Sequence, residues 1–139
     1  MGKASYLDQL RKALSDTGGP GHHVEQLQAC PTSDVVLRTQ CYIAFFVVVE
    51  RPESLRDLWR KAQTEVVNVR NDKAKEWPRD LNLVFLVGDG QPPDSATVRE
   101  LLDDRYICRK FLCKLNGGDI RDALAGLPFW PNGFESQSL

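Results

Sequence analysis

The sequence predicts a single small α/β domain in which a mixed sheet of three or four strands is packed against flanking helices. Three observations predict this class. The chain has 139 residues, the size of one compact domain. Two apolar runs, 41–49 and 81–87, have the β-branched and aromatic composition of buried strands and are too short to cross a membrane. The segment between them repeats apolar residues every three or four positions, as an amphipathic helix does.

The composition is that of an ordinary globular protein, with 42% hydrophobic and 27% charged residues. The formal net charge is −1, so the chain as a whole is not attracted to nucleic acid or acidic lipid, and any such attraction needs a local patch. The four cysteines form no C-x-x-C pair, and we expect them to be reduced. The N-terminus lacks the apolar core of a signal peptide. These features predict a cytoplasmic protein.

The first half of the chain predicts a helix followed by two strands. Leucines at helical spacing indicate a helix over 6–15. The glycines and proline of 16–21 end it, so 1–21 is expected to be an N-terminal helix and a Gly-rich joint. A short β-branched run at 35–37 predicts one strand, and the longer run at 41–49 predicts the central strand.

A strand, a helix and a second strand follow one another in the middle of the chain. Pro52 suits the first turn of a helix, where its missing N–H has no partner to lose. Apolar residues then recur at helical spacing as far as Val69, and the run at 81–87 predicts the next strand. This order is typical of a βαβ unit, which places the two strands parallel to each other.

The stretch RYICRKFLCKL, residues 105–115, contains four cations and no acid. After a loop at 88–94, Ser95 is suited to cap a helix that runs through Leu102. A break at Asp103–Asp104 followed by a strand is the interpretation we favour, although a continuous helix over 96–115 also fits the apolar spacing.

The end of the chain predicts one short helix and a tail. Asp119 can cap a helix that ends near Ala125, where Gly126 and Pro128 terminate it. The last residues, 132–139, are expected to be a mobile tail.

Read as a strand, the stretch 105–115 places cations on both of its faces. Arg109 falls in an apolar row and needs an acid, because an unpaired buried charge costs several kcal/mol. Asp103, Asp104 and Asp89 are near in sequence, so the first interpretation is an internal ion pair. A contact with a partner protein and a contact with nucleic acid remain alternatives. Lys110 and Lys114 are expected to point outward.

The segment LPFWP, residues 127–131, holds two aromatic side chains between two prolines. Because the prolines restrict the backbone, Phe129 and Trp130 can be presented to a partner at little entropic cost. The same two rings can instead fold back and close the core, and one ring can serve each purpose.

No catalytic motif is evident in the sequence. The turn VGDG at 87–90 lacks the spacing of the known phosphate-binding loops. The main enzymatic alternative is a metal-dependent nuclease with Asp89, Asp103 and Lys110 at its centre. A second alternative is direct binding of nucleic acid by the cations of 105–114.

The order of segments resembles the small middle component of bacterial three-component ABC-ATPase systems, which include Lamassu-type antiphage defence. The shared pattern has D-L-N-L-V-F-L at 80–86, D-D-R-Y-I-C-R-K at 103–110 and L-P-F at 127–129. It covers about 41–131. The chain departs from the family after C-R-K, where members often continue with a β-branched run and this sequence has Phe-Leu-Cys-Lys at 111–114.

The resemblance implies a non-catalytic accessory subunit. Such a subunit works beside a large SMC-like or Rad50-like ATPase and an effector, often a nuclease, which the complex restrains until foreign DNA is sensed. It needs apolar anchors and cationic contacts more than a pocket, so we expect no cofactor, metal, membrane contact or small-molecule substrate. The residues expected to contact the partner are Arg109, Lys110, Lys114, Phe129 and Trp130.

Overall fold

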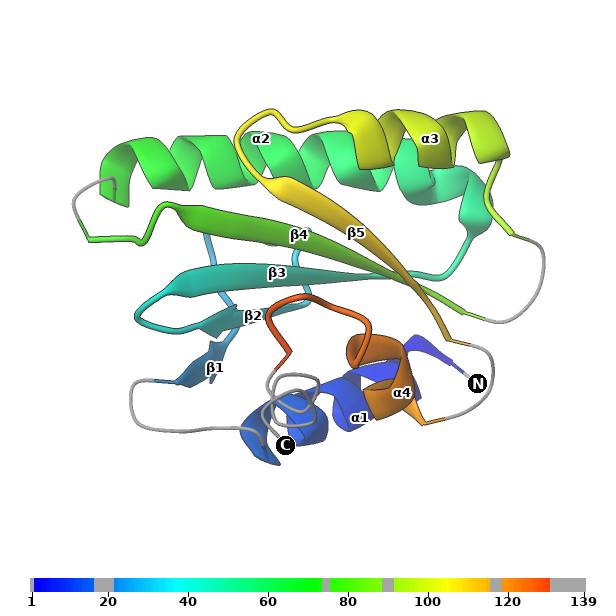
Figure 1. Ribbon diagram of the computed structural model, residues 1–139, viewed down its shortest axis with the longest axis horizontal. Coiled ribbons are helices and arrows are strands. Elements are labelled where there is room, and N and C mark those ends of the chain that lie inside the picture. The colour runs from blue at the N-terminus through cyan, green and yellow to red at the C-terminus, as the bar shows by residue number, and fades with distance from the viewer. Residues whose placement is uncertain (1, 17–21, 74–75, 89–91, 116–118, 131–139) are drawn as a thin grey trace.

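The computed structural model is a three-layer α/β fold in which one mixed sheet lies between two layers of helices. It describes residues 2–16, 22–73, 76–88, 92–115 and 119–130. Helices α2 and α3 cover one face of the sheet, and α1 and α4 cover the other (Figure 1). The predicted tail at 132–139, most of the Gly-rich joint and Asp89 lie outside the described residues.

The helices and strands alternate along the second half of the chain. In order they are α1 (Lys3–Asp16), β1 (His23–Glu25), β2 (Val35–Arg38), β3 (Tyr42–Val49), a short 3-10 turn η1 (Pro52–Ser54), α2 (Leu55–Lys73), β4 (Asp80–Val87), α3 (Ser95–Asp103), β5 (Arg109–Lys114) and α4 (Ile120–Leu124). None of the helices within the described ranges is both long enough and apolar enough to span a bilayer.

The strands follow one another across the sheet in chain order, β1-β2-β3-β4-β5. The first three form an antiparallel meander, whereas β3, β4 and β5 are parallel. Register brings Tyr42 beside Asp80, and Asn82 beside Arg109. The predicted βαβ unit is therefore present as β3-α2-β4, and α3 makes a second crossover to β5. Strands β1 and β5 are the two edges of the sheet.

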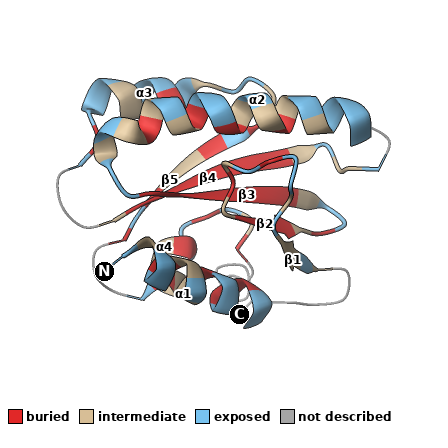
Figure 2. Cartoon of the chain, turned by 180° about the vertical axis from the view of Figure 1, so that it is seen from behind, coloured by how far each residue is buried: buried red, intermediate tan, exposed pale blue. Residues whose placement is uncertain are grey.

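Two apolar cores lie on the two faces of the sheet. Side chains of β3 and β4 alternate between them, so that both strands are buried along their length, as Figure 2 shows. Phe46 and Leu86 pack toward α1 and α4 together with Trp130. Phe45 and Phe85 pack toward α2 and α3. This double burial explains why the sequences of β3 and β4 read as continuous apolar runs.

The predicted α/β class and mixed sheet are confirmed. Three or four strands were expected; the predicted segments form β2, β3, β4 and β5, and a fifth strand, β1, adds three residues that carry no strand signature. The segment 105–115 contains a strand rather than a continued helix, although β5 begins only at Arg109. Asp119 caps α4 as predicted, but α3 is capped by Asp94, whose carboxylate accepts the N–H of Thr97, and not by Ser95.

Candidate partner interface around strand β5

A tight turn connects α3 to β5. The N–H of Cys108 donates to the carbonyl of Tyr106 at 2.7 Å, which closes a three-residue γ-turn around Ile107. Ile107 has a φ of 68°, a left-handed conformation that is strained for a β-branched residue. The N–H of Tyr106 also donates to the carboxylate of Asp104 at 2.8 Å. Backbone strain of this kind persists only where surrounding contacts hold it.

The side chain of Lys110 stabilises this turn. Its ammonium donates to the carbonyl of Tyr106 at 2.7 Å and lies 3.4 Å from the carboxylate of Asp104. The Lys110 side chain is 0% exposed. The expectation that Lys110 points outward is therefore wrong. The turn folds back over the α2/α3 face of β5, and the carbonyl and carboxylate that it brings there give the ammonium its partners.

Arg109, the preceding residue, lies on the opposite face of β5 and is 46% exposed. Its guanidinium donates to both carboxylate oxygens of Asp80, at 3.1 and 3.3 Å, and lies 5.6 Å from the centre of the Phe111 ring. An ion pair was predicted with Asp103, Asp104 or Asp89. The partner is instead Asp80, because the register of the parallel strands sets Arg109 beside the start of β4.

Two of the acids predicted to pair with Arg109, Asp104 and Asp103, lie in the described residues, and neither pairs with it. Asp104 is half-buried and pairs with Lys110 instead of Arg109. Asp103 is exposed at the end of α3 and makes no ion pair with any described residue. The predicted cluster of Asp103, Asp104 and Arg109 is therefore replaced by two separate pairs, one on each face of β5.

The two aromatic residues of the C-terminal segment differ in how far they are buried. Phe129 is half-buried, with its ring 4.8 Å from that of Tyr42 and 5.9 Å from that of Phe111. Trp130 is fully buried in the α1/α4 core, so it closes the core of its own chain and is not a surface anchor. The pKa of Tyr42 is raised, mainly because the ring is partly buried.

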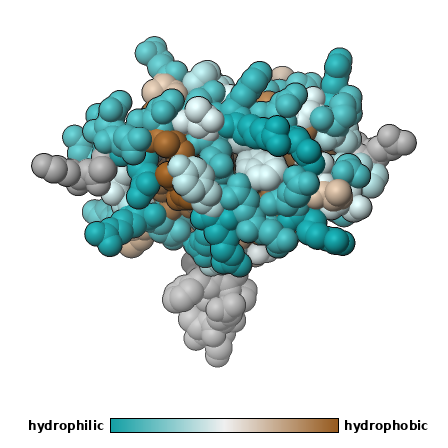
Figure 3. Space-filling model, turned by 90° about the horizontal axis from the view of Figure 1, so that it is seen from above, coloured by the Kyte–Doolittle hydropathy of each residue, from teal (hydrophilic) through white to brown (hydrophobic). Residues whose placement is uncertain are grey.

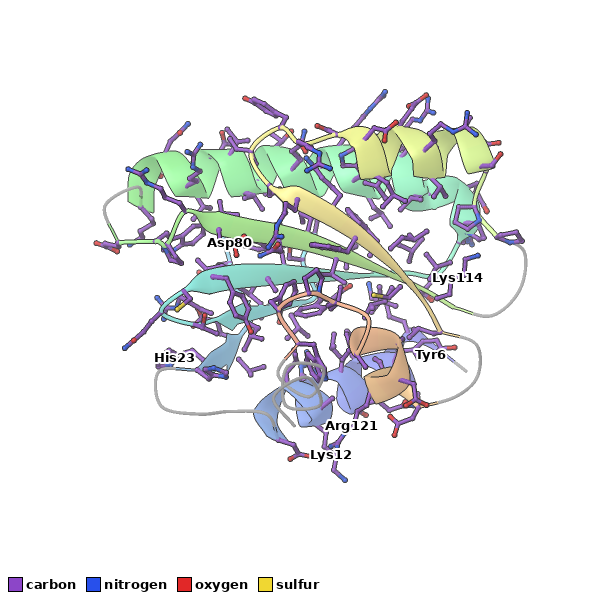
Figure 4. The ribbon with its side chains drawn as sticks, in the orientation of Figure 1. Tyr6, Lys12, His23, Asp80, Lys114 and Arg121 are labelled. Atoms are coloured by element: carbon purple, nitrogen blue, oxygen red, sulfur yellow. The ribbon has the colours of Figure 1, made fainter. Side chains whose placement is uncertain are left out.

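The surface beside β5 carries the two most exposed large apolar side chains of the described residues. Tyr106, on the strained turn, is 62% exposed, and Leu102, at the end of α3, is 45% exposed. Arg105 between them is exposed as well, and Lys114 is exposed at the far end of the strand, as expected. Figure 4 shows Lys114 at the opposite end of the β4–β5 pair from Asp80.

A groove of about 600 Å³ runs along β5 between the two helix layers. Its wall includes five consecutive residues of the strand and its end, 111–115. Leu102 of α3 lines one side, and residues of α4 and the segment after it line the other, among them Asp119, Asp122 and Leu127. Consecutive residues of a strand point to opposite faces, so the groove extends around the edge of β5.

The chemistry available around β5 is that of contact rather than of nucleophilic attack. Burial raises the pKa of the Cys108 and Cys113 thiols to about 11, so both are protonated and unreactive near neutral pH. No group of three or more His, Cys, Asp or Glu side chains is gathered to hold a metal ion in the part of the chain that is described. Lys110, which the nuclease alternative needs, is committed to Asp104 and Tyr106.

Sequence reasoning missed Tyr106 and Leu102 as surface residues. Both sit in apolar rows of the pattern, where a buried position is the ordinary expectation. The signal that separates Tyr106 from its neighbours is the strained turn at Ile107, which a strand or helix pattern does not reveal.

No protein-family model, curated protein or solved structure matches this chain.

Proposed function

We propose that this protein is a non-catalytic accessory subunit of an antiphage defence complex, acting in the bacterial cytoplasm beside an SMC-like or Rad50-like ATPase and an effector. One observation carries the proposal: Leu102, Arg105 and Tyr106 are all exposed in the short segment of chain that leads into β5, the edge strand of the sheet. Leu102 also lines the groove along β5. Exposed aromatic, apolar and arginine side chains are the composition of a protein–protein interface.

The resemblance to middle components of three-component ABC-ATPase systems supports the same function. Its three sequence segments meet in the fold, since Asp80 pairs with Arg109 and Leu127 shares a core with Leu86. The segments therefore make one structural unit around β5 instead of three unrelated motifs. Such a structural unit is suited to hold an interaction surface in a fixed shape.

The outer surfaces of α2 and α3 are less suited to an interface. Seen from that side, the molecule is mostly hydrophilic, with apolar colour confined to small patches (Figure 3). Charged side chains there pair with one another, as Arg56 of α2 does with Glu100 of α3 at 3.0 Å. We therefore propose that the partner contact lies at the edge of the sheet and the adjoining end of α3, and not on the outer surface of the two helices.

Co-purification tests this function directly. The tagged chain is expressed together with the proteins encoded by adjacent genes, and the ATPase is expected to elute with it. The double variant Leu102→Ser, Tyr106→Ser is expected to weaken that association at least about tenfold, since interface anchors of this type contribute about 2 kcal/mol or more each.

Lys12→Ser is the matched control, because Lys12 lies on the outer side of α1, far from β5 (Figure 4). A chain that stays monomeric and ignores the neighbouring ATPase would contradict the accessory role. Loss of binding by the control to the same degree would contradict the placement of the interface.

A further inference from the structure

We propose that the open edge of β5 binds an extended segment of a partner protein as an added strand of the sheet, and that this segment carries acidic side chains on its α2/α3 side. The proposal deepens the accessory function proposed above and rests on it, because it names how the partner is held. Addition of a strand to a free edge is a recurrent mode of recognition in which backbone hydrogen bonds provide affinity.

The direction of the backbone groups follows from one hydrogen bond. The N–H of Leu115 donates to the carbonyl of Val87 in β4 at 2.7 Å. Backbone groups alternate in direction along a strand, so Cys113 and Phe111 also direct theirs toward β4. Those of Leu112 and Lys114 therefore point away from the sheet. Strand β5 pairs only with β4, and no hydrogen bond among the described residues uses these outward groups.

The other edge of the sheet differs in ways that protect it. Strand β1 has three residues, half the length of β5, and the ion pair between Glu25 and Arg38 at 3.4 Å lies across it. Short edge strands and charged side chains discourage the addition of another strand. Strand β5 has neither protection along its middle, where Phe111 and Leu112 are both half-buried beside the groove.

Charge selects the kind of segment that fits. Arg105 and Lys114 are exposed cations without an ion-pair partner among the described residues, whereas Arg109 and Lys110 are already paired. Lys114 and Lys110 share the α2/α3 face of the strand. The acids Asp119 and Asp122 belong to the α4 side of the groove. A strand with acids on one face and apolar residues on the other therefore complements both sides.

A second copy of the chain is a poorer occupant. If two β5 edges paired antiparallel with Leu112 opposite its counterpart, Lys114 would lie opposite the Lys110 of the other copy. The Lys110 ammonium is enclosed and already paired with Asp104, so the β5 strand of a second copy would bring Lys114 no acid. The geometry favours a different protein, one that supplies the carboxylates that β5 lacks.

A peptide probe tests the edge without the ATPase. An acetylated and amidated peptide of the sequence Thr-Glu-Val-Glu-Val-Glu-Thr is titrated into the isotope-labelled chain, and backbone amide shifts are followed by NMR. We expect the shifts to centre on the amides of Leu112 and Lys114 and to leave β1 unchanged. The control peptide, with Lys in place of each Glu, is expected to bind at least about tenfold more weakly. Unmoved β5 amides, equal shifts at β1, or a wild-type chain that is dimeric through β5 would overturn the proposal.

Two variants of Leu112 separate the backbone contact from the side chain. Leu112→Pro removes an outward N–H that has no partner within the sheet, so β5 can tolerate it, as edge strands do. Leu112→Ala shortens the side chain and keeps the N–H. We expect Leu112→Pro to bind the peptide and the ATPase at least about tenfold more weakly than Leu112→Ala does.

The two proposals fail in different ways. If the peptide binds at β5 while no neighbouring ATPase co-purifies, the accessory function is wrong and the edge site stands. If the ATPase binds Leu112→Pro as tightly as Leu112→Ala, the ATPase does not use the edge and the accessory function stands. Should Leu112→Pro fail to fold, the peptide titration on the wild-type chain decides the matter by itself.

Discussion

The two faces of β5 hold the same kind of ion pair in two different environments. On the α2/α3 face, Lys110 is fully enclosed and its ammonium meets Asp104 and a backbone carbonyl. On the α1/α4 face, Arg109 is nearly half exposed and meets Asp80 in contact with water. Burial therefore decides what each pair does: the enclosed pair fixes the turn that presents Tyr106, and the exposed pair adds little stability and leaves a cation at the surface.

The largest effect is expected on the α1/α4 face, where apolar rings and not the ion pair provide stability. Trp130→Ala removes a fully buried ring from that core and is expected to lower the free energy of unfolding by about 3–5 kcal/mol. Urea denaturation measures it. Phe129→Ala, at a half-buried position, is the control and is expected to cost clearly less. Equal losses for the two variants would mean that Trp130 does not close the core.

Removal of the enclosed cation is expected to have the next largest effect. Lys110→Ala leaves the Asp104 carboxylate and the Tyr106 carbonyl without their donor, and a loss of about 2–4 kcal/mol in the free energy of unfolding is expected. Lys110→Met keeps the buried stem and removes only the charge. It is expected to lose less than Lys110→Ala, and both are to be measured by urea denaturation. No loss in either variant would show that the turn holds its shape without Lys110.

The stability of the chain at alkaline pH shows how well each face of the sheet excludes water, because each core contains a buried cysteine. Cys108 lies in the α2/α3 core and Cys113 in the α1/α4 core, and burial raises the pKa of each thiol from 9.0 to about 11. Between these values the unfolded chain loses the protons that the folded chain keeps, so the free energy of unfolding falls as pH rises from 9.0 to about 11.

Denaturation measured across this pH range tests the expectation. Cys108→Ala and Cys113→Ala should each reduce the slope of stability against pH by a similar amount. Cys41→Ala, at an exposed position, is the control for the substitution itself. If neither Cys108 nor Cys113 contributes to the slope, water reaches both of these thiols.

The sequence predicted much of the fold because its strongest signals are local. Apolar runs located β3 and β4, helical spacing located α2, and alternation correctly assigned Arg109 and Lys110 to opposite faces of β5. Strand β1 was not predicted, because three residues carry too little pattern to be recognised. Only their pairing with β2 makes them a strand.

The candidate site was predicted less well, because its geometry depends on residues that are distant in sequence. Asp80 lies 29 positions before Arg109 and meets it only through the register of β4 and β5. Proximity in sequence instead predicts the nearer acids, Asp103 and Asp104, as partners of Arg109. In the structure, the turn at Ile107 brings Asp104 to Lys110 instead. That turn requires a left-handed backbone at Ile107, and the sequence has no glycine there to indicate it.

The smallest effect is expected from the exposed pair. Arg109→Ala should change the free energy of unfolding by no more than about 1 kcal/mol, because water screens the charge and the side chain gains little by being held. The double variant with Asp80→Asn completes a cycle from which the coupling of the two side chains is obtained. A coupling above about 2 kcal/mol, or one that is unchanged in high salt, would mean that the Arg109–Asp80 pair is as structural as the Lys110–Asp104 pair. The expected weak coupling, by contrast, leaves the guanidinium free to exchange Asp80 for an acid of a bound partner, which a buried pair cannot do.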